Sequence, residues 1–457
     1  MKRKFLTVGL ICALVAFMLA GCGGGSSGGG NTSGQQNNNS NNVSADQNSG
    51  SSKQEDIFTG KTLVVSAQSW IIEKWPLQEA AEKFMQDHPG VKVEVKPAPD
   101  KGEADAYILQ WSQGTTNVDL ALGGSPADIA PYVAKDFLVE FDDEFFSKIG
   151  GKDRFVQPLL KQGIFKGKQY SVPLLGEVIS LNVNVDHMKE AGLVDANGYP
   201  LAPKDWNELY DFAKKLTKAE NGKTVRYGLA VDWMTNFITL NYYSGLVGTN
   251  NGKFLLDDGK TIDFQSDKAR ELLAFWQRIV NDGLTPTDGV IDANAGRNAL
   301  KAGGVSMLWT ASSRAQESEA VLGEGKVVNV PLPGTDQYGS IVFTHGMYIP
   351  KFSKNVELAK VFIQEQLLDK YGQQWSATKF GKLPVITEYY SDLSPGIQSM
   401  LKVMEHSHSE PLYQEQAKIT DLMHREISYM LTKGQSVEQT MENLAKGFAE
   451  INVHIVE

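Results

Sequence analysis

Cysteine is nearly absent from this chain of 457 residues, where it occurs only as Cys12 and Cys22. The sequence after residue 22 therefore has no thiol, which excludes a disulfide framework, a cysteine nucleophile and zinc ligation by thiolates there. Long apolar runs are lacking too, because no stretch beyond the first 20 residues approaches the roughly 18 residues that cross a bilayer. We expect core packing alone to stabilise the folded part.

Positive charge is in deficit. Lysine and arginine together number 44, against 54 aspartates and glutamates. Three of the basic residues lie at positions 2–4, and without them the balance is 41 against 54, a net charge of −13. Because binding to nucleic-acid phosphates requires a basic face, this balance argues against nucleic acid as a partner.

The N-terminal 21 residues have the pattern of a secretory signal peptide, a basic tip followed by an apolar run too short for an ordinary membrane span. The residues Leu19-Ala20-Gly21-Cys22 that end this run resemble the processing box of bacterial lipoproteins. The resemblance implies removal of residues 1–21, lipid (with palmitate) on Cys22, and a place on the extracytoplasmic face of the bacterial cell membrane. The alternative is a plain signal peptide followed by an unmodified cysteine.

Residues 22–56 are expected to form a disordered linker behind the lipidated cysteine. They are mostly Gly, Ser, Asn and Gln, with too few apolar side chains to offset the entropy cost of ordering. About 34 flexible residues have a typical reach of about 30 Å. Such a linker would keep a folded part close to the membrane.

Strand and helix patterns alternate from residue 61 onwards. Runs rich in β-formers at 61–66, 91–95 and 118–122 are separated by helical patterns at 77–86 and 104–113. This order predicts an α/β fold with a mostly parallel sheet covered by helices. Further strands are expected at 227–231, 305–309 and 327–330, and helices at 206–216, 267–282 and through most of 394–450. The length of this part indicates two lobes of ordinary size.

Two segments in the middle of the chain carry more specific patterns. Residues 172–186 read VPLLGEVISLNVNVD, and residues 203–217 read PKDWNELYDFAKKLT. The first resembles the crossover between lobes, and the second a helix, of the bacterial extracellular solute-binding proteins that include maltose-binding protein. Further segments similar to landmarks of that family follow in the family's order at 302–307, 331–334, 346–354, 357–359 and 381–385.

This resemblance implies a two-lobed periplasmic-binding-protein-like fold with a hinge and a ligand cleft between the lobes. It places lobe one at 57–177 and 346–388 and lobe two at 180–343 and 389–457. It also implies a solute-binding protein of an ABC importer, a monomer that binds a mono- or oligosaccharide and delivers it to membrane permease subunits. No catalytic residue, cofactor or metal is expected.

Saccharide binding narrows the choice of site residues. Sugar C–H faces stack on aromatic rings, hydroxyls need paired donors and acceptors, and ligands of α/β folds bind at strand ends. In the family, the crossover supplies a ligand-contacting acid at the position of Glu177. The candidate ligand-binding residues are Gln68, Trp70, Ser125, Glu177, Asp232, Trp233, Trp309, Ser313, Arg314 and His345. Trp309 lies in an apolar strand, so a place in the core is the alternative for it.

The chain departs from the maltose-type pattern. Val183 replaces a tyrosine of the crossover, Ser313 stands where a stacking tryptophan is expected, and residues 421–423 lack an aromatic. These changes argue against maltose and leave open another oligosaccharide, including one with a charged group that pairs with Arg314.

Signals for other chemistry are weak. The residues around Ser125 do not complete a nucleophile elbow, and the sequence at 259–261 lacks the first glycine of a phosphate loop. His406 and His408, flanked by Glu405 and Glu410, would diverge on a helix and have no third ligand motif. Two rival functions stay open. One is a secreted carbohydrate-active hydrolase, which needs two carboxylates at a fixed separation. The other is a surface sensor that passes the same ligand to a receptor.

Overall fold

The computed structural model describes residues 57–99, 103–234 and 236–456, which belong to one compact unit of the chain. The predicted signal peptide, the lipidation site Cys22 and the linker to residue 56 lie outside these described residues. Within the described part, no helix combines the length and the apolar character needed to cross a membrane.

The first strands form a parallel group. β1 (Thr62–Ala67) pairs in parallel with β2 (Lys92–Pro97) on one side and with β3 (Leu120–Gly124) on the other. The connections are α2 (Leu77–Asp87) and α3 (Glu103–Ser112), and α2 buries its apolar face against the sheet. The predicted β-α-β-α-β arrangement is confirmed, as periodicity 2 and periodicity 3.6 alternate along this part of the chain.

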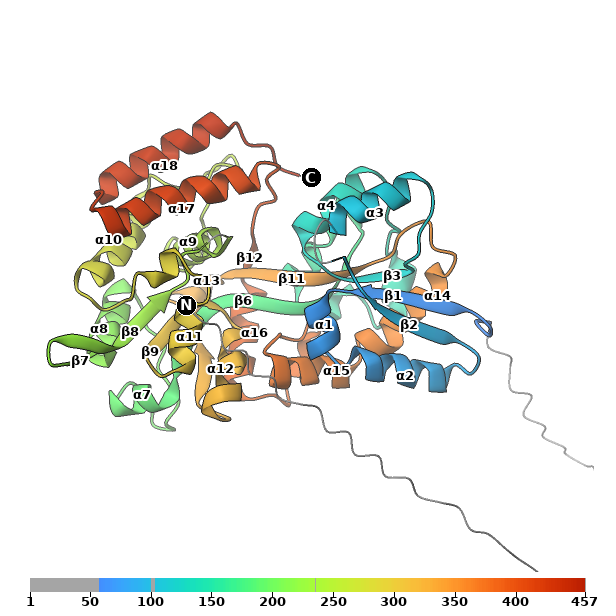
Figure 1. Cartoon of the computed structure of the whole chain (residues 1–457), viewed down its shortest axis with the longest axis horizontal. Helices are drawn as coiled ribbons and strands as arrows, with labels where there is room; N and C mark the ends of the chain where they lie inside the picture. The colour runs from blue at the N-terminus through green and yellow to red at the C-terminus, as the bar shows by residue number, and fades with distance from the viewer. Residues whose placement is uncertain (1–56, 100–102, 235, 457) are drawn as a thin grey trace, which may run out of the picture. The chain divides into compact units, whose positions relative to one another are not determined.

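Two long strands continue the sheet through the middle of the unit. β6 (Val172–Asn184) is buried over its whole length, and β11 (Ile341–Tyr348) runs antiparallel to both β6 and β3. The strand order is β2-β1-β3-β11-β6-β9-β8-β7, in which β9 spans Val305–Ala311, β8 spans Lys223–Val231 and β7 spans Lys218–Glu220. The sheet is mixed, which corrects the expectation of a mostly parallel sheet, because β11 and β6 run antiparallel to their neighbours in this order. The first half of β6 pairs with β11 and the second half with β9, so one strand belongs to both halves of the sheet. Figure 1 shows β6 and β11 running between the group around β1–β3 and the group around β8 and β9.

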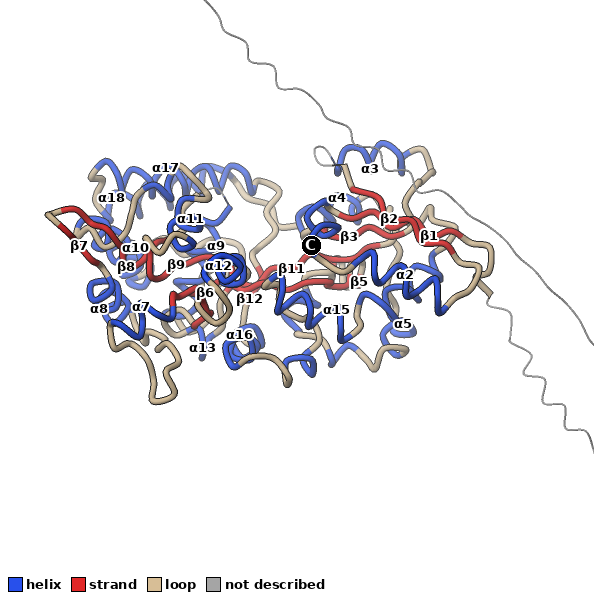
Figure 2. The backbone as a smooth tube through the Cα atoms, turned by 60° about the horizontal axis from the view of Figure 1, so that its bottom comes forward, coloured by secondary structure: helices blue, strands red, loops and turns tan. Residues whose placement is uncertain are grey.

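The far half of the sheet is covered by helices. β8 (Lys223–Val231) pairs in parallel with β9 (Val305–Ala311), and β10 (Val327–Val330) pairs antiparallel with β6. Helices surround these strands as they surround β1–β3 at the other end (Figure 2). The helices of this half are α8 (Trp206–Leu216), α9 (Asn236–Thr249), α10 (Asp267–Asn281), α11 (Ala295–Lys301), α12 (Arg314–Leu322), α17 (Gln416–Lys433) and α18 (Val437–Ile451).

The remaining elements are short. They are α1 (Ser69–Lys74), α4 (Pro126–Ala134), α5 (Asp143–Ser147), η1 (Lys152–Arg154), α6 (Gln157–Lys161), β4 (Ile164–Phe165), β5 (Lys168–Gln169), α7 (Val185–Glu190), β7 (Lys218–Glu220), η2 (Asp288–Val290), α13 (Thr335–Tyr338), α14 (Val356–Phe362), η3 (Ile363–Leu367), α15 (Lys370–Trp375), η4 (Ser376–Phe380), η5 (Thr387–Tyr390), α16 (Pro395–Glu405) and β12 (His408–Ser409).

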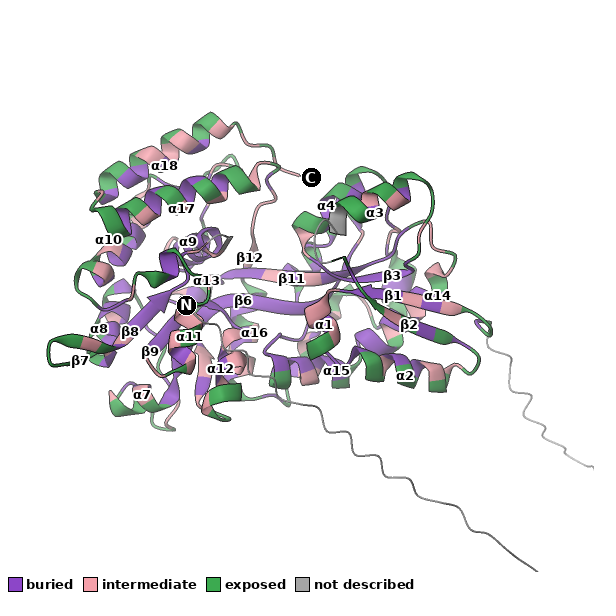
Figure 3. Ribbon diagram, in the orientation of Figure 1, coloured by how far each residue is buried: buried purple, intermediate pink, exposed green. Residues whose placement is uncertain are grey.

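Two large hydrophobic clusters lie on either side of the central strands, whose burial is visible in Figure 3. The first cluster joins β1–β3 to α2 and α14, and the second joins β8 and β9 to α8, α10, α17 and α18. Helix α16 contributes Met400, Val403 and Met404 to the first cluster, although the predicted boundary places residues 389–457 in lobe two. The lobe boundaries as such stay a prediction.

The C-terminal part differs from the nearly continuous helical region that was expected. Between α16 and α17, residues 406–415 contain the short strand β12 and an extended segment. Pro411 lies in this segment, and a proline removes a helical N–H and disfavours helix in the residue before it.

Candidate functional site

The candidate site is built on a buried carboxylate, that of Glu177, which we call the floor of the site. Glu177 lies within β6 and is 1% exposed. Its Oε2 accepts a hydrogen bond of 2.6 Å from the hydroxyl of Ser313, and its Oε1 forms an ion pair with Lys382 and lies 3.7 Å from Nε2 of His345. Four distant segments thus meet at one carboxylate. This pairing is what allows a charge to remain buried.

Lys382 follows η4 and is almost fully buried beside Glu177. Burial, together with the positive charge of Lys74, lowers the pKa of Lys382 to about 7. The carboxylate of Glu177 opposes both effects, because an opposite charge in contact favours the ammonium form. The ion pair therefore depends on both partners being present.

Trp70 stands next to this pair. It lies in α1, is partly exposed, and donates from its indole nitrogen to Oε1 of Gln68 at 2.6 Å. Its ring contacts the ring of His345 edge-on at a centroid distance of 4.7 Å, and Nζ of Lys382 lies 5.2 Å from its centroid. Phe380 also lies near the Trp70 ring, at 5.5 Å.

His345 connects the floor to the end of β3. Its Nδ1 lies 3.3 Å from the carbonyl oxygen of Gly123, and burial lowers the pKa of His345 to about 4. The imidazole is therefore neutral at pH 7, and Nδ1 carries the proton because a carbonyl oxygen only accepts. Gly123 has φ of +109°, and a Cβ there would lie 2.8 Å from a methyl of Ile71. The positive φ and the side chains of Ile71 and Gln68 packed against this position both favour glycine.

Ser125 lies two residues further along, at the start of α4. Its hydroxyl accepts from the backbone N–H of Asp128 and also donates to that carboxylate at 2.6 Å, while Asp128 accepts from the backbone N–H of Ser125. This capping box stabilises the first turn of α4. The side chain of Ser125 is thus occupied by the helix terminus in this structure.

A second charged group lies at the ends of β8 and β9. Asp232 is buried, accepts from the hydroxyl of Thr310 at 3.4 Å, and lies 3.7 Å from Nη2 of Arg297. Burial raises the pKa of Asp232 to about 6, although Arg297 and Arg314 favour the ionised form. The charge of Arg314 also lowers the pKa of His345, which places the two groups within electrostatic reach of one another.

Arg314 begins α12, directly after Ser313. It forms an ion pair with Glu317 on its own helix, and Glu317 lies 3.5 Å from Nζ of Lys301. Since Ser313 binds Glu177, the start of α12 connects the floor of the site to this second group.

Trp233 and Trp309 lie in the hydrophobic core, which corrects their interpretation as ligand platforms. Trp309 is fully buried and its ring stacks on Trp206 at 5.5 Å with an interplanar angle of 16°. Trp233 is 1% exposed and its ring meets Trp276 edge-on at 6.1 Å. Their ring faces are covered by other side chains, so a sugar cannot stack on them in this structure. The alternative of a core position holds for Trp309.

The structure thus brings together five of the predicted site residues, Gln68, Trp70, Glu177, Ser313 and His345. Arg314 directly follows Ser313, and Asp232 lies with Arg297 in the second charged group. Sequence reasoning missed Lys382, Phe380 and Arg297. Lys382 lies in a segment that resembles a family landmark, so its position was noticed but its pairing with Glu177 was not. Nothing in the short polar helix α11 distinguishes Arg297.

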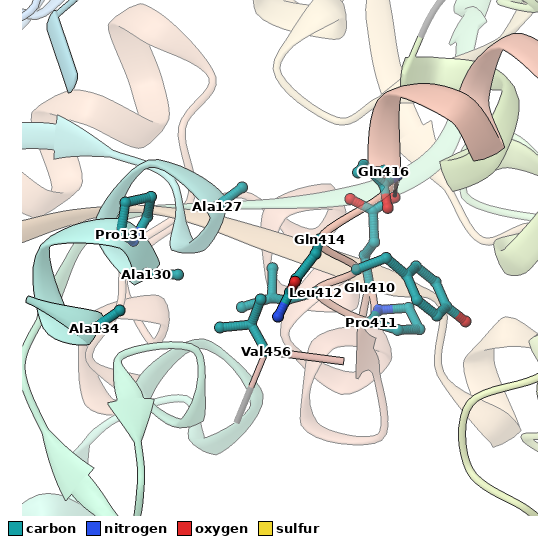
Figure 4. A pocket seen from close by; sticks show the side chains of 11 residues that line it. Ala127, Ala130, Pro131, Ala134, Glu410, Pro411, Leu412, Gln414, Gln416 and Val456 are labelled. Carbon is teal, nitrogen blue, oxygen red and sulfur yellow. Dashed lines mark hydrogen bonds between the residues drawn. The ribbon is translucent and has the colours of Figure 1, made fainter. Parts of the chain in front are cut away.

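A cavity of about 330 Å³ lies between α4 and the segment around residues 410–416. Figure 4 shows Ala130, Pro131 and Ala134 on one side and Leu412 and Val456 on the other, with Glu410 and Gln416 further along. Its lining is mostly apolar, and it could accommodate the apolar face of a ligand.

Glu410 is the acidic group at this cavity. It accepts from the hydroxyl of Thr239 at 3.0 Å and from Nε2 of Gln416 at 3.4 Å, and burial raises its pKa to about 7. Nothing in the sequence indicated a perturbed carboxyl there.

No group of three or more His, Asp or Glu side chains within the described ranges could hold a metal ion. His406 caps the C-terminus of α16 and His408 lies in β12, so these two histidines do not share a helix.

Comparison with known proteins gives consistent matches. The family model described as "Bacterial extracellular solute-binding protein" matches residues 67–373. The arabinooligosaccharide-binding protein of Bacillus subtilis (strain 168) is 21% identical over 432 residues, which cover 86% of this chain and 91% of that protein.

Solved structures with a similar fold include two sugar complexes. Maltose-bound MalE3 of T. maritima has 21% sequence identity and a TM-score of 0.67, covering 86% of this chain and 100% of that one. A solute-binding protein of an ABC transporter from Thermotoga lettingae, bound with α-D-tagatose, has 22% identity and a TM-score of 0.68, covering 86% and 99%. The likeness confirms the predicted two-lobed α/β fold.

Proposed function

The chain belongs to the bacterial extracellular solute-binding proteins, and on this premise we propose that it binds a saccharide between its two lobes, around Trp70 and Glu177. Members of this family bind solutes and are not enzymes, in agreement with the prediction of a chain without catalytic activity. The rival interpretation as a hydrolase loses its support.

The observation that carries the saccharide proposal is a partly exposed indole beside a buried polar network. Trp70 offers an aromatic surface for sugar C–H groups, while Glu177, Ser313 and His345 place hydrogen-bonding groups close to it. An aromatic platform with a few fixed polar groups is the usual composition of a small-molecule site. Trp70 and Gln68 come from the β1 side, and Ser313 and Arg314 from the β9 side, so a ligand here would contact both lobes.

The comparisons give further support. Three of the similar proteins are an arabinooligosaccharide-binding protein, a maltose complex and a tagatose complex, and all three ligands are saccharides. For this chain we therefore propose a mono- or oligosaccharide ligand and keep its identity open.

The proposal extends to place and partner. A lipid on Cys22 and the linker 22–56 would hold the protein at the extracytoplasmic face of the membrane as a monomer. Lobe one (57–177 and 346–388) and lobe two (180–343 and 389–457) would close around the ligand by a hinge motion, and the closed form would deliver it to the permease of an ABC importer.

A thermal-shift screen of the mature chain, meaning the chain without the predicted signal peptide 1–21, against a panel of mono- and oligosaccharides tests the proposal. A ligand that binds only the folded state raises the melting temperature, by an amount set by its concentration relative to Kd. We expect at least one saccharide to do so without being cleaved. If no saccharide of the panel raises the melting temperature, saccharide binding is contradicted. Release of cleavage products would instead favour the alternative function, a carbohydrate-active hydrolase.

A further inference from the structure

We propose that the saccharide carries a carboxylate group, as a uronic acid does, and that Arg297 and Arg314 bind it. This inference rests on the proposed function and names the chemical class of ligand for the same site. It starts from the second charged group, at the ends of β8 and β9, which a neutral sugar would not require.

Neither arginine is fully engaged by protein groups. Nη2 of Arg297 lies 3.7 Å from Asp232, beyond hydrogen-bond distance, and Arg314 pairs with a glutamate one turn along its own helix. The Nε atoms of both side chains are buried and have no hydrogen-bond partner among the residues that the structure describes. A guanidinium has five N–H donors, so each arginine keeps donors for a ligand.

Both side chains are also within reach of a ligand. Arg297 is 17% exposed and Arg314 is 19% exposed, so part of each side chain is accessible to a ligand. Arg314 directly follows Ser313, which hydrogen-bonds the floor carboxylate Glu177. A saccharide resting on Trp70 and Glu177 would therefore extend toward these guanidinium groups.

The net charge of this second charged group has the opposite sign to the net charge of the whole chain. The group contains three cations (Arg297, Lys301, Arg314) and two anions (Asp232, Glu317), an excess of one positive charge in a chain with a net charge of −10. On the floor, Lys382 and Glu177 neutralise each other, and His345 is neutral.

One extra positive charge matches the single negative charge of a carboxylate better than the double charge of a phosphate. The planar fork of arginine also matches the carboxylate oxygens.

The test compares matched ligands that differ only at C6. Calorimetric titration of the mature chain would use galacturonate and glucuronate oligosaccharides beside neutral galactose and glucose oligosaccharides of the same linkage and length. We expect the tightest ligand to be a uronate, bound about tenfold or more tightly than its neutral counterpart, and weakened by added salt.

Variants assign the effect to the two arginines. Arg297→Gln and Arg314→Gln should each remove most of the preference for the uronate, measured in each variant as the ratio of the Kd for the neutral oligosaccharide to the Kd for the uronate. Arg314→Lys keeps the positive charge but lacks the planar guanidinium group. This variant should retain part of the preference for the uronate. The control is Arg270→Gln, an exposed arginine of α10 that pairs with Glu438 and should change neither affinity. Melting temperatures of the unliganded variants show that each is folded.

The outcomes separate this inference from the proposed function. A neutral oligosaccharide bound as tightly as its uronate, or a preference that survives both glutamine variants, would overturn the inference and leave saccharide binding intact. Absence of binding to every saccharide of either kind would overturn both.

Discussion

Tryptophans of this chain show how burial separates packing from binding at the scale of single residues. We predict that Trp309→Ala lowers the free energy of unfolding of the unliganded chain by about 3–5 kcal/mol, since it leaves a cavity in the core. Trp233→Ala should lower the free energy of unfolding to a similar extent, because this side chain is buried as well. Trp70→Ala should change the free energy of unfolding by less than about 1 kcal/mol, because the side chain of Trp70 is partly exposed. Urea unfolding followed by circular dichroism measures all three.

Equal losses in Trp70→Ala and Trp309→Ala would show that Trp70 is a core residue. Such a result would remove the aromatic platform from the site, whatever its effect on binding.

Glu410 gives a pH-dependent prediction. Its pKa is raised from the ordinary 4.5 to about 7, so between these values the folded state holds a proton that the unfolded state has lost. Its contribution to stability is therefore present at pH 4.5 and is lost as the pH rises to 7. Glu410→Gln lacks this loss and should gain about 1–3 kcal/mol relative to wild type between pH 5 and pH 8. Urea unfolding at both pH values measures the gain.

The matched control for Glu410 is Glu450→Gln, which replaces an exposed glutamate of α18. Its stability relative to wild type should stay nearly constant over the same range. A Glu410→Gln variant that behaves like this control would mean that Glu410 is solvated.

Site residues were predictable where a strand end or a landmark placed them. Trp70 follows β1 and Glu177 lies in the crossover, and the two come together with Ser313 and His345. Trp233 also follows a strand, yet it is core, because helix α10 brings Trp276 against it. Lys382 and Arg297 become site residues only through contacts between segments far apart in sequence, which local patterns do not contain.

Packing of elements can be tested at the contact of β8 with α8. An added Cβ on Gly228 would lie 1.9 Å from the carbonyl oxygen of Ala213, so the helix and strand approach too closely for any side chain. We predict that Gly228→Ala costs about 2 kcal/mol or more, because a well-packed contact must open. Thermal unfolding would show a melting temperature lowered by several degrees.

Gly304→Ala is the control for this contact, since the nearest atom to its added Cβ lies at 3.6 Å. It should unfold close to wild type. Similar effects of the two substitutions would mean that glycine at 228 is not required by packing.

Elements were predicted best where the apolar period was clear. The helix expected at 206–216 and the strand expected at 327–330 match α8 and β10. The full length of β6 was not predicted, because a strand buried on both faces has no alternation to mark its ends. Residues 406–415 were expected to be helical, and there Pro411 outweighed the helical pattern on either side.

At the scale of the whole molecule, one sheet is shared by two hydrophobic clusters. β6 pairs with β11 in its first half and with β9 in its second, and Glu177 lies just before the change of partner. A ligand at Glu177 would therefore lie where relative movement of the two halves of the sheet changes the contacts of the ligand most. This position makes binding and closure a single event in the proposed mechanism.

The most direct test is a calorimetric titration of the mature chain, wild type and Trp70→Ala, with the oligosaccharide that raises the melting temperature most. We predict saturable binding at one site per chain, and a Kd at least about tenfold higher in Trp70→Ala through loss of the stacking surface. The free energies of unfolding of the two unliganded chains should agree within about 1 kcal/mol. An unchanged Kd in Trp70→Ala, or a wild-type chain that gives no saturable heat with any saccharide, would contradict the central claim.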